Sequence, residues 1–212
     1  MNDSIIAINP IRFSSENLLN LLENKDCYSS IQEKKSESRK QEWLSIRLLL
    51  KEILGEEKEI IYQESGKPIL KDQSYNISIS HTKGYVAIIL NKNKSVGIDI
   101  ERISNRVYNI RSRFLNEKEE TNISTQNELI HLLLHWSAKE TLFKVLDENE
   151  VDFKTQLHIH PFEPIINEWA QFTASETKTE KEETFVIDYL VTKEYVVTLT
   201  IKNDFVATRF LE

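Results

Sequence analysis

The sequence predicts an α+β fold made of two similar lobes, each a long helix packed on a small, mainly antiparallel sheet. Two observations support this: short strand-like segments with alternating apolar residues, and two long helical segments with apolar residues along one face. The order of these elements in the first half of the chain recurs in the second half. We therefore predict lobes of residues 1–103 and 104–212, with a ligand site in the cleft between them.

The first half begins with an apolar strand at residues 5–8, which ends at Asn9 and Pro10. A short helix is expected at residues 15–23. A longer helix is expected from about residue 30 to 54, where Gly55 stops it. Further strands are predicted at residues 59–63, 76–80, 85–90 and 96–101. The turn after the first of these contains Gly66, Lys67 and Pro68.

The second half starts with a short helix that ends at Arg113. Asn116 is a suitable helix N-cap, and Glu119 stands three residues later, which is the pattern of a capping box. A long helix is predicted over residues 127–146. Strands follow at residues 156–160, 168–173, 184–191 and 195–201, and the polar run 175–183 is expected at the tip of a hairpin.

The two long helices share residue spacing as well as position in the element order. A tryptophan, two polar or charged residues and an apolar residue occur at the same offsets in each helix. These positions are Trp43, Arg47, Lys51 and Ile53 in the first helix, and Trp136, Glu140, Lys144 and Leu146 in the second. Together with the repeated order of elements, the matching offsets favour an internal duplication.

Composition excludes several classes of function. The chain has 212 residues and a formal net charge of −7, which argues against a nucleic-acid-binding protein because phosphate neutralisation needs a basic surface. Cys27 is the only cysteine, so no disulfide within the chain is possible. We find neither a secretory signal at the N-terminus nor an apolar run long enough to span a bilayer. A cytoplasmic protein without membrane contact is expected.

The segment Val96-Gly97-Ile98-Asp99-Ile100-Glu101 places two carboxylates on one strand face, because residues two apart in a strand point the same way. Ile98 and Ile100 are then directed into the core. Two neighbouring carboxylates repel unless a cation lies between them, and carboxylate oxygens with phosphate are typical ligands of Mg²⁺. The alternative is a strand end whose polar face is simply solvated.

Trp136, Glu140 and Lys144 follow one another at intervals of four residues and therefore lie along one face of the second long helix. In a cleft, Glu140 would offer a carboxylate to a metal or a proton, and Lys144 an ammonium group to a phosphate. The alternative is an ordinary surface ion pair, which contributes only a few tenths of a kcal/mol.

The strand at residues 76–80 alternates isoleucine with serine. We expect Ile77 and Ile79 to face the core, and Ser78 and Ser80 to face outward. The strand leads to His81, which together with the neighbouring hydroxyl groups is able to hydrogen-bond a phosphate. A structural role for this histidine is the alternative.

Together these segments resemble the 4'-phosphopantetheinyl transferase superfamily, and in particular its monomeric, Sfp-type branch. That family has five short motifs in a fixed order, and the chain contains a counterpart of each. They are Gly66-Lys67-Pro68, Ser80-His81-Thr82, Gly97-Ile98-Asp99-Ile100-Glu101, Phe114 with Glu119, and Trp136-x-x-Lys139-Glu140-x-x-x-Lys144. The resemblance covers residues 34–144, and the tail beyond Leu146 matches only in being rich in strands.

The resemblance implies a pseudo-twofold fold with coenzyme A in the cleft. By position, Asp99, Glu101 and Glu140 would hold Mg²⁺ against the pyrophosphate, and Lys144 would contact a phosphate. The resemblance also implies further contacts with coenzyme A: phosphate contacts from Ser80 and His81, a place beside the adenine for Lys67 and Pro68, and contact with the 3'-phosphate from Lys34, Lys35 or Arg39.

The activity that the resemblance implies is transfer of 4'-phosphopantetheine from coenzyme A to a serine of an apo acyl, peptidyl or aryl carrier protein, with release of 3',5'-ADP. Glu140 is the candidate base and acts with Lys144 and His81. Carrier proteins are acidic, so a basic segment at residues 102–113 is the expected docking surface. Two alternatives remain open: a non-catalytic module that binds coenzyme A or a nucleotide, and a phosphohydrolase that cleaves coenzyme A in water.

Overall fold

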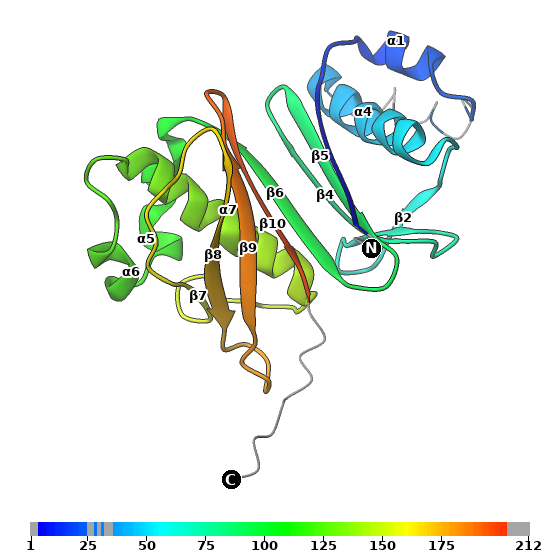
Figure 1. Cartoon of the computed structure of the whole chain (residues 1–212). Helices are drawn as coiled ribbons and strands as arrows, with labels where there is room; N and C mark the ends of the chain where they lie inside the picture. Colours follow the sequence, from blue (N-terminus) through cyan, green and yellow to red (C-terminus); the bar gives the residue numbers. More distant parts are fainter. Residues whose placement is uncertain (1–3, 25–27, 29–30, 32–35, 203–212) are drawn as a thin grey trace.

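The computed structural model describes residues 4–24, 28, 31 and 36–202, and these residues form a mixed α+β fold (Figure 1). The helices are α1 (Ser15–Asn20), α4 (Glu37–Leu54), the 3-10 helix η1 (Asn105–Ile110), α5 (Arg111–Phe114), α6 (Glu117–Thr121) and α7 (Glu128–Leu146). The strands are β1 (Ser4–Pro10), β2 (Ile60–Tyr62), β3 (Pro68–Leu70), β4 (Asn76–Thr82), β5 (Tyr85–Asn91), β6 (Val96–Arg102), β7 (Leu157–Ile159), β8 (Trp169–Glu176), β9 (Thr184–Val191) and β10 (Tyr195–Ile201).

The predicted elements are found in the predicted order. The first long helix ends at Leu54 because Gly55 adopts a left-handed conformation with φ of 76° and caps the helix. Its expected start near residue 30 falls in a stretch that is only partly described, and Lys34 lies outside the described residues. One strand was not predicted: β3 pairs with β2 as a small hairpin, in a segment that the sequence indicated only as a turn.

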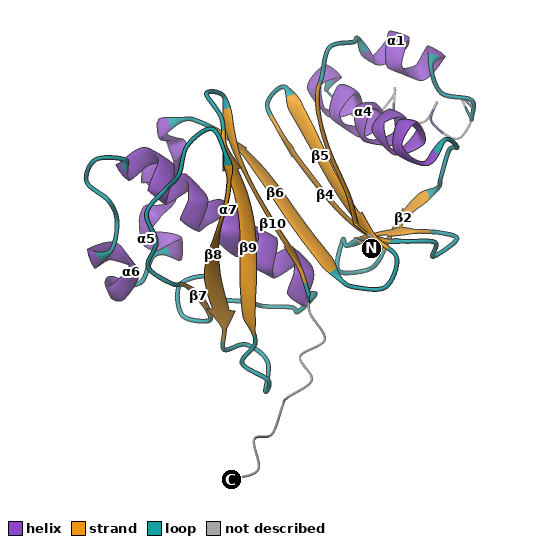
Figure 2. Cartoon of the chain, viewed as in Figure 1, coloured by secondary structure: helices purple, strands orange, loops and turns teal. Residues whose placement is uncertain are grey.

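The strands form three sheets, and every pairing between described strands is antiparallel, as predicted. One sheet has the order β1-β5-β4, a second has the order β6-β10-β9-β8-β7, and the third is the β2-β3 hairpin. In Figure 2 the two larger sheets lie between the group of helices around α7 and the pair α1 and α4. By its hydrogen bonds, β6 belongs to the sheet formed by the last strands of the chain, although it directly follows β5 in sequence.

Strand β6 lies beside β4 as well as β10 (Figure 1), but β4 and β6 are joined by side chains rather than by a backbone ladder. Hydroxyl groups of β4 accept hydrogen bonds from the backbone N–H groups of every second residue of β6. The pairs are Ser78 with Ile98 N at 3.2 Å, Ser80 with Ile100 N at 3.3 Å, and Thr82 with Arg102 N at 3.1 Å. The prediction that Ser78 and Ser80 face outward is therefore wrong: both are buried against β6.

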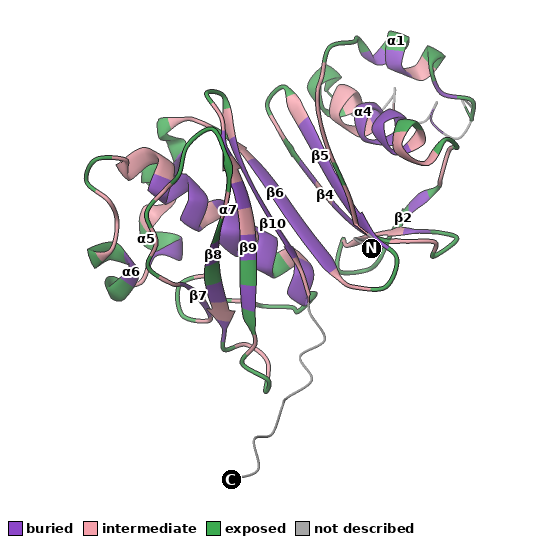
Figure 3. Cartoon of the chain, in the orientation of Figure 1, coloured by how far each residue is buried: buried purple, intermediate pink, exposed green. Residues whose placement is uncertain are grey.

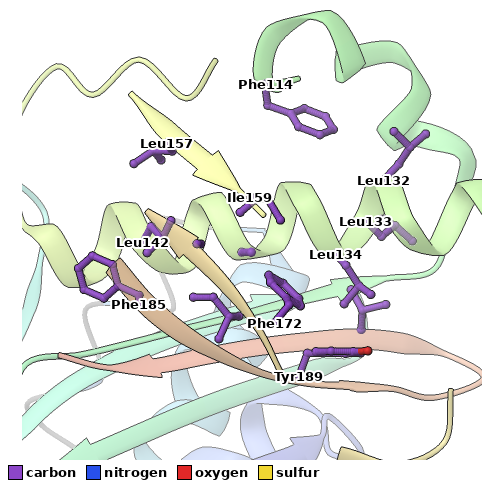
Figure 4. Packing of buried hydrophobic residues seen from close by; sticks show 14 of the residues in the cluster. Phe114, Leu132, Leu133, Leu134, Leu142, Leu157, Ile159, Phe172, Phe185 and Tyr189 are labelled. Carbon is purple, nitrogen blue, oxygen red and sulfur yellow. The ribbon is translucent and has the colours of Figure 1, made fainter. Parts of the chain in front are cut away.

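Each long helix covers a separate apolar core. Helix α4 contributes Ile46, Leu49 and Leu50 to a core with β4 and β5, and α7 is buried in a larger core that includes Leu142, Phe172 and other residues labelled in Figure 4. Ile98 and Ile100 of β6 are buried in a third cluster, as predicted, and β5 and β6 are buried along most of their length (Figure 3). No helix in the described part of the chain has the length and apolar character that crossing a membrane requires.

The predicted capping box is present at the start of α6. Asn116 accepts a hydrogen bond from Glu119 N at 2.9 Å, and the Glu119 carboxylate accepts one from Asn116 N at 3.1 Å. Glu119 has a second role, because its carboxylate also binds the buried ammonium group of Lys139 at 2.7 Å. The loop before α6 is thereby fixed to the middle of α7, one residue from Glu140.

Candidate active site

A cavity of about 580 Å³ lies between α4, the β2–β3 region, β4 and the C-terminal half of α7. Its volume is in the range of small-molecule and cofactor sites. The residues that line it are Arg39, Glu42, Trp43, Ile46, Tyr62, Ser65, Gly66, Lys67, Pro68, Ile77, Ser78, Ile79, His81, Glu140, Phe143, Lys144, Asp147, Glu148 and Asn149. Segments from both halves of the chain thus form one cavity.

Most of the predicted ligand-binding residues line this cavity. They are Arg39, Lys67, Pro68, His81, Glu140 and Lys144. The other predicted site residues with described positions, Ser80, Asp99 and Glu101, lie behind Lys144 and next to the cavity wall rather than in it.

Asp99 is buried beneath Lys144. Its Oδ1 atom accepts hydrogen bonds from Lys144 Nζ and from Ser80 Oγ, each at 2.8 Å. Lys144 Nζ also donates to the backbone oxygen of Ile98 at 2.9 Å, which ties the end of α7 to β6. Because a serine hydroxyl has one proton, Ser80 has none left for a phosphate while it donates to Asp99.

Two further carboxylates sit close enough to Asp99 to feel its charge. Burial, and then the negative charge of Asp99, raises the pKa of Glu101 to about 7 and the pKa of Glu140 to about 7. Glu101 is held in place by Trp136, whose indole N–H donates to Glu101 Oε1 at 2.8 Å. The predicted spacing of Trp136, Glu140 and Lys144 therefore brings all three to the carboxylate face of β6.

The donor set fits a hard divalent cation. Asp99 Oδ2 is buried and has no hydrogen-bond partner among the described residues, and the charges of Glu101 and Glu140 are unfavourable beside Asp99 without a compensating cation. Carboxylate oxygens are the ligands that Mg²⁺ takes from proteins. In the arrangement observed, no three His, Cys, Asp or Glu side chains of the described residues converge as a ready-made metal site.

The sequence did not point to several residues that line the cavity. Asp147 forms an ion pair with Lys67 at 2.9 Å, so the Gly66-Lys67-Pro68 turn is linked to the end of α7. Glu42 was missed although it follows Arg39 by three residues on one helix face, which is the available signal. Trp43 was noted only as a helix position, and its ring stacks on the buried Arg47 guanidinium at 3.0 Å.

Comparison with known families identifies the part of this site that the second half of the chain contributes. The model of the 4'-phosphopantetheinyl transferase superfamily matches residues 95–200, which is half of the chain. The chain belongs to the 4'-phosphopantetheinyl transferase superfamily. A search of curated proteins found no match.

The superfamily match begins just before β6 and ends within β10. It therefore includes Asp99, Glu101, Glu140 and Lys144, which form the carboxylate cluster and its ammonium partner. The opposite wall of the cavity, with Arg39 and the other residues from α4 to β4, lies outside the matched span. In this member of the 4'-phosphopantetheinyl transferase superfamily, the cavity thus lies between the matched carboxylate cluster and a basic wall that the first half of the chain contributes.

Proposed function

We propose that this protein transfers 4'-phosphopantetheine from coenzyme A to a serine of an apo acyl, peptidyl or aryl carrier protein. The observation that carries the proposal is the single cavity that combines the cationic side chains Arg39, Lys67 and Lys144 with Glu140 and the adjacent pair Asp99 and Glu101. The cations suit the phosphate groups of coenzyme A, and the carboxylates suit Mg²⁺.

In the proposed reaction the carrier serine oxygen forms a bond to the β-phosphorus of coenzyme A. The bond from that phosphorus to the bridging oxygen breaks, and 3',5'-ADP leaves with this oxygen. Glu140 is the proposed acceptor of the serine proton, because among Asp99, Glu101 and Glu140 it is the one that lines the cavity. His81 binds a phosphate, and Lys144, held 2.8 Å from Asp99, supplies positive charge near the reacting groups.

Asp99, Glu101 and Glu140 are the residues that we propose to hold Mg²⁺. When bound, this ion would neutralise charge on the pyrophosphate oxygens. Lys67 and Pro68 are proposed to lie beside the adenine, with Arg39 at the 3'-phosphate. Ser80 would contact a phosphate only by giving up its hydrogen bond to Asp99. The same role for Lys34 remains a prediction from the sequence.

We also propose the division into lobes of residues 1–103 and 104–212, related by duplication, with the site in the cleft between them. The packing of α4 on β5 suits a first lobe and that of α7 on β10 a second, whereas β6 lies on the first-lobe side of the proposed boundary but pairs with β10 and packs on α7. From the resemblance to the monomeric branch of the superfamily we propose action as a monomer, and we propose the cytoplasm as its location. Arg102, Arg106 and Arg113 are exposed and form the proposed docking surface for an acidic carrier, whereas Arg111 is already paired with Glu120 and Glu128.

The test is incubation with coenzyme A, Mg²⁺ and a panel of apo carrier proteins, followed by intact mass measurement. We expect one phosphopantetheine group to be added to at least one carrier, and none to the same carrier with its acceptor serine replaced by alanine. Release of 3',5'-ADP at the same rate without any carrier would instead indicate a phosphohydrolase. Binding of coenzyme A without any turnover would indicate a non-catalytic module.

Within this assay we predict that Asp99→Asn abolishes transfer but leaves the protein folded. Asparagine keeps the shape of the side chain and an oxygen for Ser80, but it removes the charge that Lys144 and the proposed metal require. Circular dichroism and thermal unfolding check the fold. Near-normal transfer by this variant at saturating Mg²⁺ would contradict the metal assignment.

A further inference from the structure

A carboxylate lies in the part of the cavity where the proposed function places phosphate groups. The side chain of Glu42, on α4, is 13% exposed and lines the cavity. Its Oε1 atom accepts a hydrogen bond from Ser38 Oγ at 3.1 Å, which fixes the orientation of the carboxylate. A negative charge in a phosphate site weakens phosphate binding unless it acts through a neighbouring cation, so the contacts of the second oxygen decide its role.

That second oxygen, Glu42 Oε2, faces His81. It lies 3.7 Å from His81 Nδ1 and 4.0 Å from Arg39 Nη1. It is buried and has no hydrogen-bond partner among the described residues, so it is available to accept the Nδ1 proton. Within the described part of the chain, Glu42 is the one carboxylate that reaches His81 to within 4.0 Å.

This geometry determines what His81 presents to a ligand. Glu42 faces Nδ1 at a distance too long for a hydrogen bond, so Nε2 is the nitrogen left for the ligand. Nε2 donates to a phosphate oxygen when it carries a proton, and as an acceptor it would repel that oxygen.

We propose that Glu42 is a positioning residue for His81: its carboxylate faces Nδ1 and orients the imidazole, so that Nε2 points to a phosphate of coenzyme A. This inference rests on the proposed function. The same oxygen lies 4.0 Å from Arg39 Nη1, so Glu42 lies between His81 and Arg39.

Other charged groups line the same cavity and act on His81 at longer range. The cations are Arg39, Lys67 and Lys144, and the acids are Glu140, Asp147 and Glu148. Asp147 is paired with Lys67, and Glu140 lies on the opposite wall with Lys144. Glu148 provides a matched control, because it is an exposed acid that lines the cavity without an ion pair to His81 among the described residues.

The test is calorimetric titration of 3',5'-ADP and of coenzyme A into the wild-type protein, Glu42→Gln and Glu148→Gln. Loss of the Glu42 charge removes the contact that orients the imidazole, so we expect both ligands to bind Glu42→Gln about tenfold more weakly than the wild-type protein. Glu148→Gln should bind them as tightly as the wild-type protein.

Two further readouts separate positioning from a merely structural role. In the transfer assay Glu42→Gln should raise KM for coenzyme A while kcat changes little, and Glu42→Asp, which restores the charge, should recover part of the affinity.

Tighter binding by Glu42→Gln would overturn the inference, because Glu42 would then act only by repelling phosphate. An unchanged affinity, or one equal to that of Glu148→Gln, would overturn it as well. A wild-type protein that binds neither ligand would refute the proposed function and this inference with it. A wild-type protein that binds both ligands, beside an unchanged Glu42→Gln variant, would refute the inference alone.

Discussion

The closest approach of α7 to the carboxylate strand occurs at Gly97, and Gly97→Ala is the sharpest single test of the site. Gly97 lies on β6 and directly faces the backbone of Thr141 on α7. An added methyl group would overlap the carbonyl oxygen of Thr141, and it would lie 3.2 Å from the carbonyl carbon and 3.3 Å from Cγ2 of that residue. A helix backbone cannot turn aside as a flexible side chain does, so β6 and α7 must separate.

The size of the effect follows from these distances. Carbon atoms in contact prefer a separation of about 3.5–4.0 Å, so the helix has to retreat by several tenths of an ångström, and further to clear the oxygen. Overpacking of this kind typically costs about 1–3 kcal/mol of stability. Glu140 is adjacent to Thr141, and Asp99 follows Gly97 by two residues, so the separation also spreads the carboxylates. A misplacement of about 1 Å can reduce a rate by about 100-fold.

We therefore expect Gly97→Ala to remain folded, to lose about 1–3 kcal/mol in urea unfolding and to lose about 100-fold in kcat for phosphopantetheine transfer. Gly84→Ala is the matched control. Gly84 has φ of 89° and open space around it, so alanine there costs backbone strain without moving α7. If Gly97→Ala transferred as fast as Gly84→Ala at equal folded fraction, the coupling between this contact and the site would be refuted.

Two predictions concern buried charge and protonation in the α7 core. Lys139→Met should lose about 3–5 kcal/mol of unfolding free energy in urea, because Glu119 is left buried without its cation. Adding Glu119→Gln should restore part of the lost stability. No recovery in the double variant would refute the unpaired Glu119 charge as the cause. Burial lowers the pKa of His135 to about 3, below the unfolded value of about 6.5, so the unfolded chain binds the extra proton between these values. Stability should therefore fall by up to about 1.4 kcal/mol for each pH unit below about 6.5. His135→Gln should reduce this slope, and equal slopes in urea unfolding would contradict the prediction.

Local sequence patterns predicted most of the fold because the forces involved act over a few residues. Alternation placed Ile98 and Ile100 in the core, where burial on one strand face confirms it. Gly55 ended the first long helix, and Asn116 began α6 through its side chain, because caps satisfy backbone groups within three or four residues. The spacing of Trp136 and Lys144 likewise predicted that both lie on one helix face, and this face meets β6.

Contacts between segments far apart in the chain were not predictable in the same way. The alternation of residues 76–80 predicts two distinct faces, but it does not say what covers the polar one, and here β6 covers it. The pairing of Lys67 with Asp147 depends on how the two halves pack. Glu42 follows Arg39 on one helix face, but that spacing does not reveal its significance, which comes from lying opposite His81 on another element.

Ser80 shows how the joint between β4 and β6 is coupled to the candidate site. Its hydroxyl oxygen accepts the backbone N–H of Ile100 at 3.3 Å, and its proton is donated to Asp99 Oδ1 at 2.8 Å. One side chain therefore both joins the strands and sets the orientation of a carboxylate, which leaves Asp99 Oδ2 without a hydrogen-bond partner among the described residues. His81 follows directly and turns toward the cavity. The Ser-His segment thus fixes the positions of a proposed metal ligand and of a proposed phosphate ligand relative to each other, so a shift of β4 against β6 would displace both together.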